Sequence, residues 1–151
     1  MQPRLIHATA IAMGGYAALI RGPSGAGKSD LALRCLGVSA STLLPQRTLL
    51  VADDQVLLTR NSDHITTTAP AQIRGQLEVR GLGIVEVDTC ADARLVLVVD
   101  LAAAALIERM PEPDHCEIDG IVLPRLAMYP FEASAALKLL MCLQATRQRY
   151  S

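Results

Sequence analysis

Aromatic side chains are scarce in this chain. They make up 3% of its 151 residues, with no Trp and a single Phe. Proteins that bind single-stranded nucleic acid stack bases on aromatic side chains, so this composition argues against that class. The formal net charge of −1 provides no basic surface for phosphate backbones either. We therefore expect no nucleic-acid partner.

Patterned cysteines and membrane-spanning runs are also missing. The four cysteines, at positions 35, 90, 116 and 142, form neither a C-x-x-C pair nor a zinc-binding spacing. The longest apolar run, 95–107, is interrupted by Asp100 and is too short to span a bilayer. No secretory signal is recognisable. These features predict a cytoplasmic protein with reduced thiols and no membrane partner.

Lysine occurs at two positions only, Lys28 and Lys138. The first belongs to a full match to G-x-x-x-x-G-K-[ST], formed by Gly22, Pro23, Ser24, Gly25, Ala26, Gly27, Lys28 and Ser29. Glycines let successive backbone N–H groups converge on a phosphate, and the following helix directs its positive end at the same anion. In such a loop the lysine contacts the β- and γ-phosphates, and the hydroxyl of Ser29 can bind Mg²⁺.

The length fits one domain, 1–151, and the 51% hydrophobic content suits a globular core. One helix precedes several short strands joined by turns, and most connections are too short for parallel crossovers. We therefore expect an α/β fold with a mixed, largely antiparallel sheet. The expected strands are 5–13, 16–20, 48–52, 55–59, 65–68, 77–80, 84–87, 95–100 and 121–129, the last as an edge strand because of Pro124. The expected helices are 30–36 and 132–147, the second with Leu137, Leu140, Met141 and Gln144 at helical spacing.

Three further positions carry candidate chemistry. Asp53 and Asp54 end an apolar strand, where one carboxylate is placed to hold Mg²⁺ and the other to accept a proton from a hydroxyl. Glu78 shares a strand face with Arg80 before two glycines. His7 lies on the strand expected to pair with the one entering the phosphate loop, where either a structural or a functional role is open.

These segments together resemble the C-terminal catalytic domain of HPr kinase/phosphorylase. The matching residues are His7, 22–29, 50–54 and 77–84, of which Leu77-Glu78-Val79-Arg80-Gly81-Leu82-Gly83-Ile84 is the most specific. The resemblance runs from His7 to Arg109. Because the phosphate loop begins near residue 22, the chain resembles the short proteobacterial form, and we expect no N-terminal regulatory domain.

The resemblance implies an ATP- and Mg²⁺-dependent serine kinase acting on an HPr-like phosphocarrier of the phosphotransferase system. It implies a P-loop fold similar to phosphoenolpyruvate carboxykinase and a homo-oligomer, usually a hexamer. It also implies roles for single residues: Lys28 binds phosphates, Ser29 and Glu78 bind Mg²⁺, Asp54 accepts the proton, Asp53 supports the metal or base, and His7 and Arg109 match active-site positions. The family also removes the phosphoryl group by phosphorolysis, but its Pro- and Arg-rich segment for that reaction has no recognisable counterpart at 123–130.

Two other functions remain open from the residues alone. A P-loop kinase for small molecules is one, although the scattered Arg21, Arg34 and Arg47 do not suggest the lid that such enzymes close. The other is a non-enzymatic nucleotide- or phosphate-sensing module. Asp53, Asp54 and Glu78 argue against that module, because binding alone needs no proton acceptor.

Overall fold

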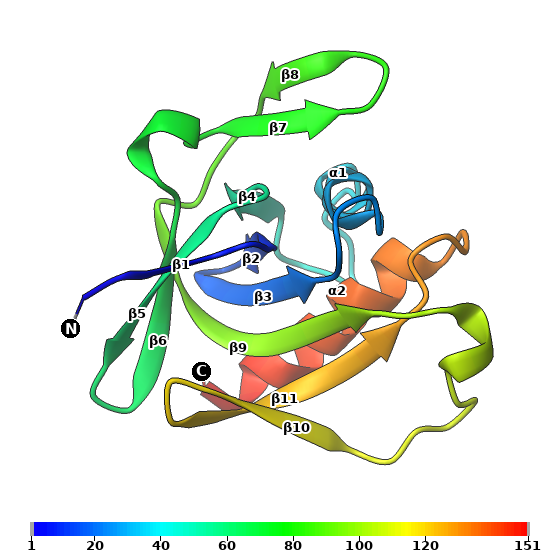
Figure 1. The fold of residues 1–151 in the computed structure, drawn as a ribbon. Helices are drawn as coiled ribbons and strands as arrows, with labels where there is room; N and C mark the ends of the chain where they lie inside the picture. Colours follow the sequence, from blue (N-terminus) through cyan, green and yellow to red (C-terminus); the bar gives the residue numbers. More distant parts are fainter. Residues whose placement is uncertain (1, 151) are drawn as a thin grey trace.

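The computed structural model describes residues 2–150 (Figure 1). The strands are β1 (Arg4–Ile6), β2 (Thr9–Met13), β3 (Tyr16–Arg21), β4 (Thr48–Ala52), β5 (Val56–Asn61), β6 (His64–Thr68), β7 (Gln76–Val79), β8 (Gly83–Glu86), β9 (Asp92–Leu101), β10 (Asp114–Ile118) and β11 (Ile121–Met128). The helices are α1 (Lys28–Leu36) and α2 (Ala135–Arg147), with 3-10 turns η1 (Ala71–Ile73), η2 (Ala104–Leu106) and η3 (Gln148–Tyr150).

The main sheet is mixed, as the short connections predict. Its order is β1-β5-β6-β9-β3-β2-β4, and β11 joins it beside β9 with β10 as its outer neighbour. Only the β3–β9 and β9–β11 pairs are parallel. Strands β7 and β8 form a separate two-stranded sheet that projects from the body (Figure 1). The fold class is therefore confirmed as α/β with largely antiparallel pairing.

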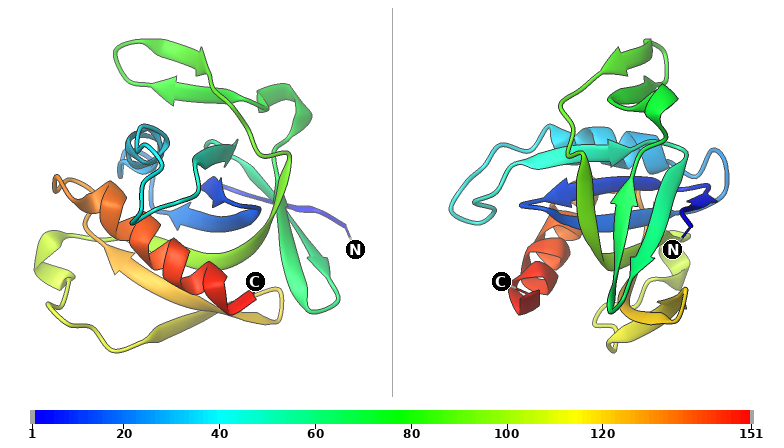
Figure 2. Two further views of the ribbon diagram at one scale, coloured as in Figure 1. Left: turned by 180° about the vertical axis from the view of Figure 1, so that it is seen from behind. Right: turned by 90° about the vertical axis from the view of Figure 1, so that its left-hand side faces the viewer.

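Hydrophobic residues are buried on both faces of the sheet. Helices α1 and α2 lie together on one face, where Ile20, Leu31 and Leu139 belong to one core cluster (Figure 2). On the other face the sheet curls over itself, so that Leu58 of β5 and Leu123 of β11 pack in a cluster with Leu19 of β3. None of the helices within residues 2–150 is long and apolar enough to cross a membrane.

Two strand predictions need correction. The expected strand 5–13 is divided at His7 and Ala8, because β1 pairs with β5 whereas β2 pairs with β3 and β4. The expected edge strand 121–129 is not at the edge, because β10, which we did not predict, pairs outside it. Pro124 is tolerated because parallel pairing with β9 starts only at Arg125, one residue later.

The second helix starts at Ala135, three residues later than expected, and its buried face is also different. Leu139, Leu140 and Leu143 are buried, whereas Leu137 and Met141 are exposed. Apolar residues lie on all sides of this helix, so its spacing could not indicate which side faces the core.

Candidate active site

The phosphate-binding loop connects β3 to α1, as the motif predicts. Gly25 and Gly27 have φ values of 83° and 100°, in the region that strongly favours glycine. Gly27 precedes the first residue of α1, so the helix begins at Lys28 rather than at Asp30. The positive end of α1 is thereby directed at the loop, the arrangement that attracts a phosphate.

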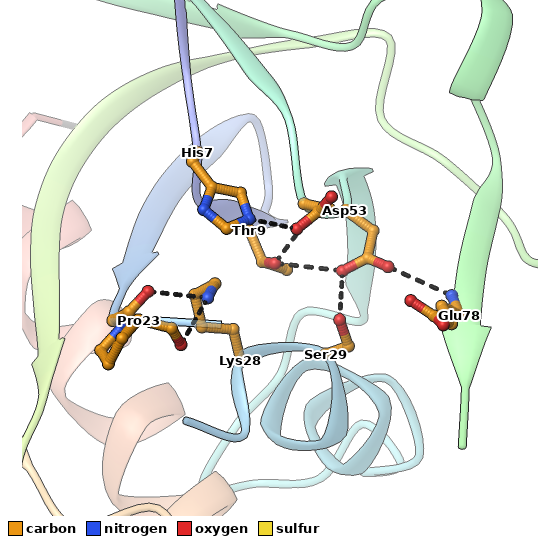
Figure 3. A network of polar contacts seen from close by, with 9 residues as sticks. His7, Thr9, Pro23, Lys28, Ser29, Asp53 and Glu78 are labelled. Atoms are coloured by element: carbon orange, nitrogen blue, oxygen red, sulfur yellow. Dashed lines mark hydrogen bonds and ion pairs between the residues drawn. The ribbon is translucent and has the colours of Figure 1, made fainter. Parts of the chain in front are cut away.

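Lys28 is folded back against its own loop. Its side chain is buried, and Nζ donates hydrogen bonds to the carbonyl oxygens of Gly22 at 2.7 Å and Pro23 at 3.1 Å (Figure 3). Neither carbonyl carries a formal charge, so these bonds orient the ammonium without neutralising it. Its charge therefore remains available to an anion that binds in the loop.

Asp53 is the centre of a hydrogen-bond network that joins four elements (Figure 3). Its Oδ1 accepts hydrogen bonds from the hydroxyls of Ser29 at 2.6 Å and Thr9 at 3.0 Å. Its Oδ2 accepts one from the backbone N–H of Glu78 at 3.1 Å. The carboxylate is 6% exposed and is fixed by β2, α1 and β7 at the end of β4.

The hydroxyl of Thr9 also accepts a hydrogen bond from the backbone N–H of Asp54 at 3.2 Å. Thr9 therefore positions both acidic residues, and sequence reasoning missed it. The sequence shows only a hydroxyl beside an apolar stretch; its full burial, which requires a partner, is visible only in the structure.

Asp54 differs sharply from its neighbour. Its φ is 67°, a left-handed conformation that Asp tolerates better than most residues, and its side chain is 61% exposed. Its Oδ1 lies 2.5 Å from Nε2 of His7. Asp54 therefore presents a carboxylate to the cavity with an imidazole beside it, an arrangement suited to accepting a proton.

A cavity of about 660 Å³ contains part of the phosphate loop together with Asp54 and Glu78. It is lined by Ser24, Gly25, Gly27, Lys28, Ser29, Asp30, Leu33, Asp54, Glu78, Val79, Arg80, Gly81, Gly83 and Phe131. The structure thus brings the phosphate loop, Asp54 and Glu78 together. Arg80 and Phe131 join them, and the sequence did not assign either to the site.

Among the predicted catalytic residues, His7, Asp53 and Arg109 do not line the cavity. His7 and Asp53 are hydrogen-bonded to the lining residues Asp54 and Ser29, whereas Arg109 is exposed in the loop between η2 and β10. Its match rested on Glu108-Arg109-Met110 alone. Among residues 2–150, no strand pairing connects the loop that contains Arg109 to the phosphate loop.

Ser29, Asp53 and Glu78 supply oxygen donors of the kind that Mg²⁺ prefers. Within residues 2–150 no three His, Cys, Asp or Glu side chains are grouped closely enough to hold a metal ion. This sparse donor set fits Mg²⁺, which keeps several waters and is completed by nucleotide phosphates in P-loop sites.

A partly buried ion-pair network supports the start of the loop. Arg21, which precedes Gly22, donates from Nε and Nη2 to Asp100 of β9 at 2.7 and 2.8 Å. Arg125 of β11 donates from Nε to the same carboxylate at 2.5 Å. Burial alone would raise the pKa of Asp100, but the hydrogen bonds from both guanidinium groups hold it below its usual range.

Comparisons with known proteins agree with this geometry. A family model described as the HPr Serine kinase C-terminal domain matches residues 2–101. The HPr kinase/phosphorylase of Limosilactobacillus reuteri (strain DSM 20016) is 34% identical over 135 residues, covering 82% of this chain and 40% of that protein. The corresponding protein of Bordetella pertussis is 34% identical over 130 residues, covering 79% and 39%.

The fold also matches a solved structure, described as the Hpr(Ser) kinase/phosphatase from Coxiella burnetii. The TM-score is 0.79 at 19% identity, over 97% of this chain and 98% of that one. This match extends the agreement in fold beyond residue 101, where the family model ends.

Proposed function

The chain belongs to the HPr serine kinase C-terminal domain family, and on that premise we propose that it is an ATP-dependent serine kinase for an HPr-like phosphocarrier protein. The chain spans about 40% of the length of its curated relatives in Limosilactobacillus and Bordetella, so their activity is carried over as part of this proposal. The single observation that supports it best is the exposed Asp54 carboxylate, which lines the same cavity as Lys28 and Ser29.

In this proposal the loop and Lys28 hold the phosphates of ATP. The glycine-rich backbone and the start of α1 supply N–H donors, and the ammonium supplies a full positive charge. Ser29, Asp53 and Glu78 would hold Mg²⁺, which supplies further neutralisation of phosphate charge when bound. Phosphoryl transfer depends mainly on positioning and charge stabilisation, and these residues provide both.

Asp54 is the proposed proton acceptor. The serine oxygen of the carrier forms a bond to the γ-phosphorus, and the bond from that phosphorus to the bridging oxygen of ADP breaks. The serine proton moves to a carboxylate oxygen of Asp54. His7 and the hydroxyl of Thr9 hold Asp54 in place through its Oδ1 and its backbone N–H.

The remaining features of the proposal come from the family. They are removal of the phosphoryl group from the carrier by phosphorolysis and assembly into a homo-oligomer, a hexamer by resemblance. The cytoplasmic location proposed here comes instead from the unpatterned cysteines. The role of Arg109 also stays a prediction. We do not expect nucleic acid or a membrane among the partners.

The proposal is tested by incubating the chain with HPr-like phosphocarriers of its native host and γ-labelled ATP. We expect one labelled serine, located by mass spectrometry, and none on a carrier in which that serine is alanine. Absence of label on every serine, with an active control kinase present, would contradict the proposal.

Two further experiments separate the other two functions. A screen of small hydroxyl and nucleotide acceptors would reveal a small-molecule kinase by labelling one of them in preference to the carrier. A sensing module would keep its biological output in Asp54→Asn and lose it in Lys28→Ala, because binding needs the lysine but no proton acceptor. A serine kinase loses its output in both variants.

A further inference from the structure

The segment 129–132 forms one border of the cavity, and its only cavity-lining side chain is an aromatic ring. Phe131 lines the cavity and is 59% exposed. It is also the single Phe of the chain, which has no Trp. Residues 129–132 are called the aromatic lip below.

The aromatic lip is fixed to the phosphate-loop helix. Arg34 of α1 donates from Nη2 to the carbonyl oxygen of Pro130 at 2.5 Å and from Nη1 to that of Glu132 at 3.4 Å. Lys138 of α2 forms an ion pair with Glu132. The lip therefore has a defined position although the ring that it carries is exposed.

The ring of Phe131 lies directly on the phosphate loop. A Cβ atom built on Gly27 would be 3.0 Å from both Cε1 and Cζ of Phe131. Tyr129 supports the ring from its edge, with the centroids 5.8 Å apart and the planes at 78°. A large apolar ring is thus held at the loop while much of its surface remains free.

The cavity offers different chemistry along its length. Lys28 and Ser29 supply the charge and the hydroxyl that phosphates need, and Asp54 and Glu78 supply carboxylates. The lining also contains apolar side chains, Leu33 of α1, Val79 of β7 and Phe131. A nucleotide has the same two parts, a charged phosphate chain and a flat base whose faces stack on aromatic rings.

We propose that Phe131 is the base-stacking residue of the nucleotide site, and that Arg34 is a positioning residue that holds the aromatic lip against the phosphate loop. This inference rests on the proposed function, because it assigns the base of the same nucleotide whose phosphates the loop binds. It makes the aromatic lip the part of the chain that distinguishes a nucleotide from an inorganic polyphosphate.

The first test uses the single Phe as a spectroscopic probe. In a chain labelled only at phenylalanine, MgATP at saturation should give nuclear Overhauser contacts between the ring protons of Phe131 and the H2 or H8 proton of adenine. Bound MgATP without any such contact would overturn the inference.

The second test separates base from phosphate by calorimetry with MgATP and with inorganic tripolyphosphate plus Mg²⁺. Phe131→Ala should raise the Kd for MgATP about 5- to 150-fold and leave that for tripolyphosphate unchanged, since aromatic stacking contributes in that range. Phe131→Trp should restore MgATP binding. Leu106→Ala, a matched control at an exposed residue outside the cavity, should change neither Kd.

Arg34→Ala should weaken binding of MgATP but not of tripolyphosphate, and it should broaden or split the Phe131 ring signal. A merely structural role of Arg34 would weaken binding of MgATP and tripolyphosphate alike. The inference fails if Phe131→Ala binds MgATP as the unaltered chain does, if it loses both ligands equally, or if the unaltered chain binds neither. A selective loss of MgATP in a chain that phosphorylates no carrier would support the base contact and contradict the proposed kinase.

Discussion

The two ends of the cavity are built in different ways. At the inner end, Lys28 is buried in the lining, and behind Ser29 the buried Thr9 and Asp53 are joined to it by hydrogen bonds. At the outer end, Phe131 is more than half exposed, and β7 and β8 pair only with each other.

This difference indicates that the two ends serve different steps of the reaction. Phosphoryl transfer requires charges that stay in place, and the inner end fixes them within the packed sheet. Binding of the base requires apolar surface that is open to solvent before the nucleotide arrives, and the outer end supplies it. Substitutions at the inner end should therefore impair the transfer step or the metal that it needs, and those at the outer end should reduce affinity for the nucleotide.

Lys28→Ala should have the largest effect, because it removes the one ammonium held at the phosphates. We expect kcat/KM for MgATP to fall about 10³-fold, the loss typical of removing a group that stabilises transition-state charge. Initial rates of carrier phosphorylation measure it, and an unchanged circular dichroism spectrum would show that the fold is retained. A loss below tenfold would contradict the proposed role of Lys28 in transfer at the inner end.

Thr9→Val should have the next largest effect. It keeps the shape of the side chain but removes the hydrogen bonds to Asp53 and from the backbone of Asp54. We expect the Mg²⁺ concentration for half-maximal activity to rise about 10- to 100-fold, as for other groups that orient metal ligands. Thr9→Ser, which keeps the hydroxyl, should retain most of the affinity. If both variants behave alike, the hydroxyl has no such role.

Asp100→Asn should act on stability rather than on chemistry. It removes the carboxylate shared by Arg21 and Arg125, and we expect the free energy of unfolding at pH 7 to fall by about 2 kcal/mol. Because the folded-state pKa of Asp100 is lowered, its contribution is present above the unfolded pKa of about 3.9 and is lost as pH falls through the folded value. Urea unfolding at pH 7 and pH 3 should show the difference between the chains narrowing at the lower pH.

Cys35 gives the smallest effect and tests the packing between α1 and α2 beneath the phosphate-loop helix, where it contacts the carbonyl oxygen of Ala136. Burial in α1 raises the pKa of its thiol to about 12, so thiolate is scarce at pH 8. We expect iodoacetamide to leave Cys35 unmodified in the native chain and to label it in urea, as followed by peptide mass spectrometry. Rapid labelling without urea would show that this packing opens.

The inner end was the more predictable from sequence. The phosphate loop, Asp53, Asp54 and Glu78 belong to contiguous motifs. The structure brings the loop, Asp54 and Glu78 to one cavity and joins Asp53 to Ser29 and Glu78 by hydrogen bonds. Thr9 was missed because its partners lie more than 40 residues away, and no local pattern encodes a pairing between β2 and β4.

The outer end and the second helix were less predictable. Phe131 reaches the loop only because Arg34 holds the lip, a contact between residues almost 100 positions apart. The buried face of α2 could not be predicted because its apolar residues lie all around the helix. Strand β10 was missed because Asp114-His115-Cys116-Glu117 has no strand-like alternation of apolar residues.

The division between the two ends is tested most directly by rapid-quench measurement of a single turnover. Phosphoryl transfer from saturating MgATP to the phosphocarrier would be compared in Asp54→Asn and Phe131→Ala. Loss of the proton acceptor should slow transfer about 10²-fold or more in Asp54→Asn. Phe131→Ala should transfer within about threefold of the unaltered chain once MgATP is saturating, because only ground-state binding is lost. Transfer by Asp54→Asn at the rate of the unaltered chain would contradict the account.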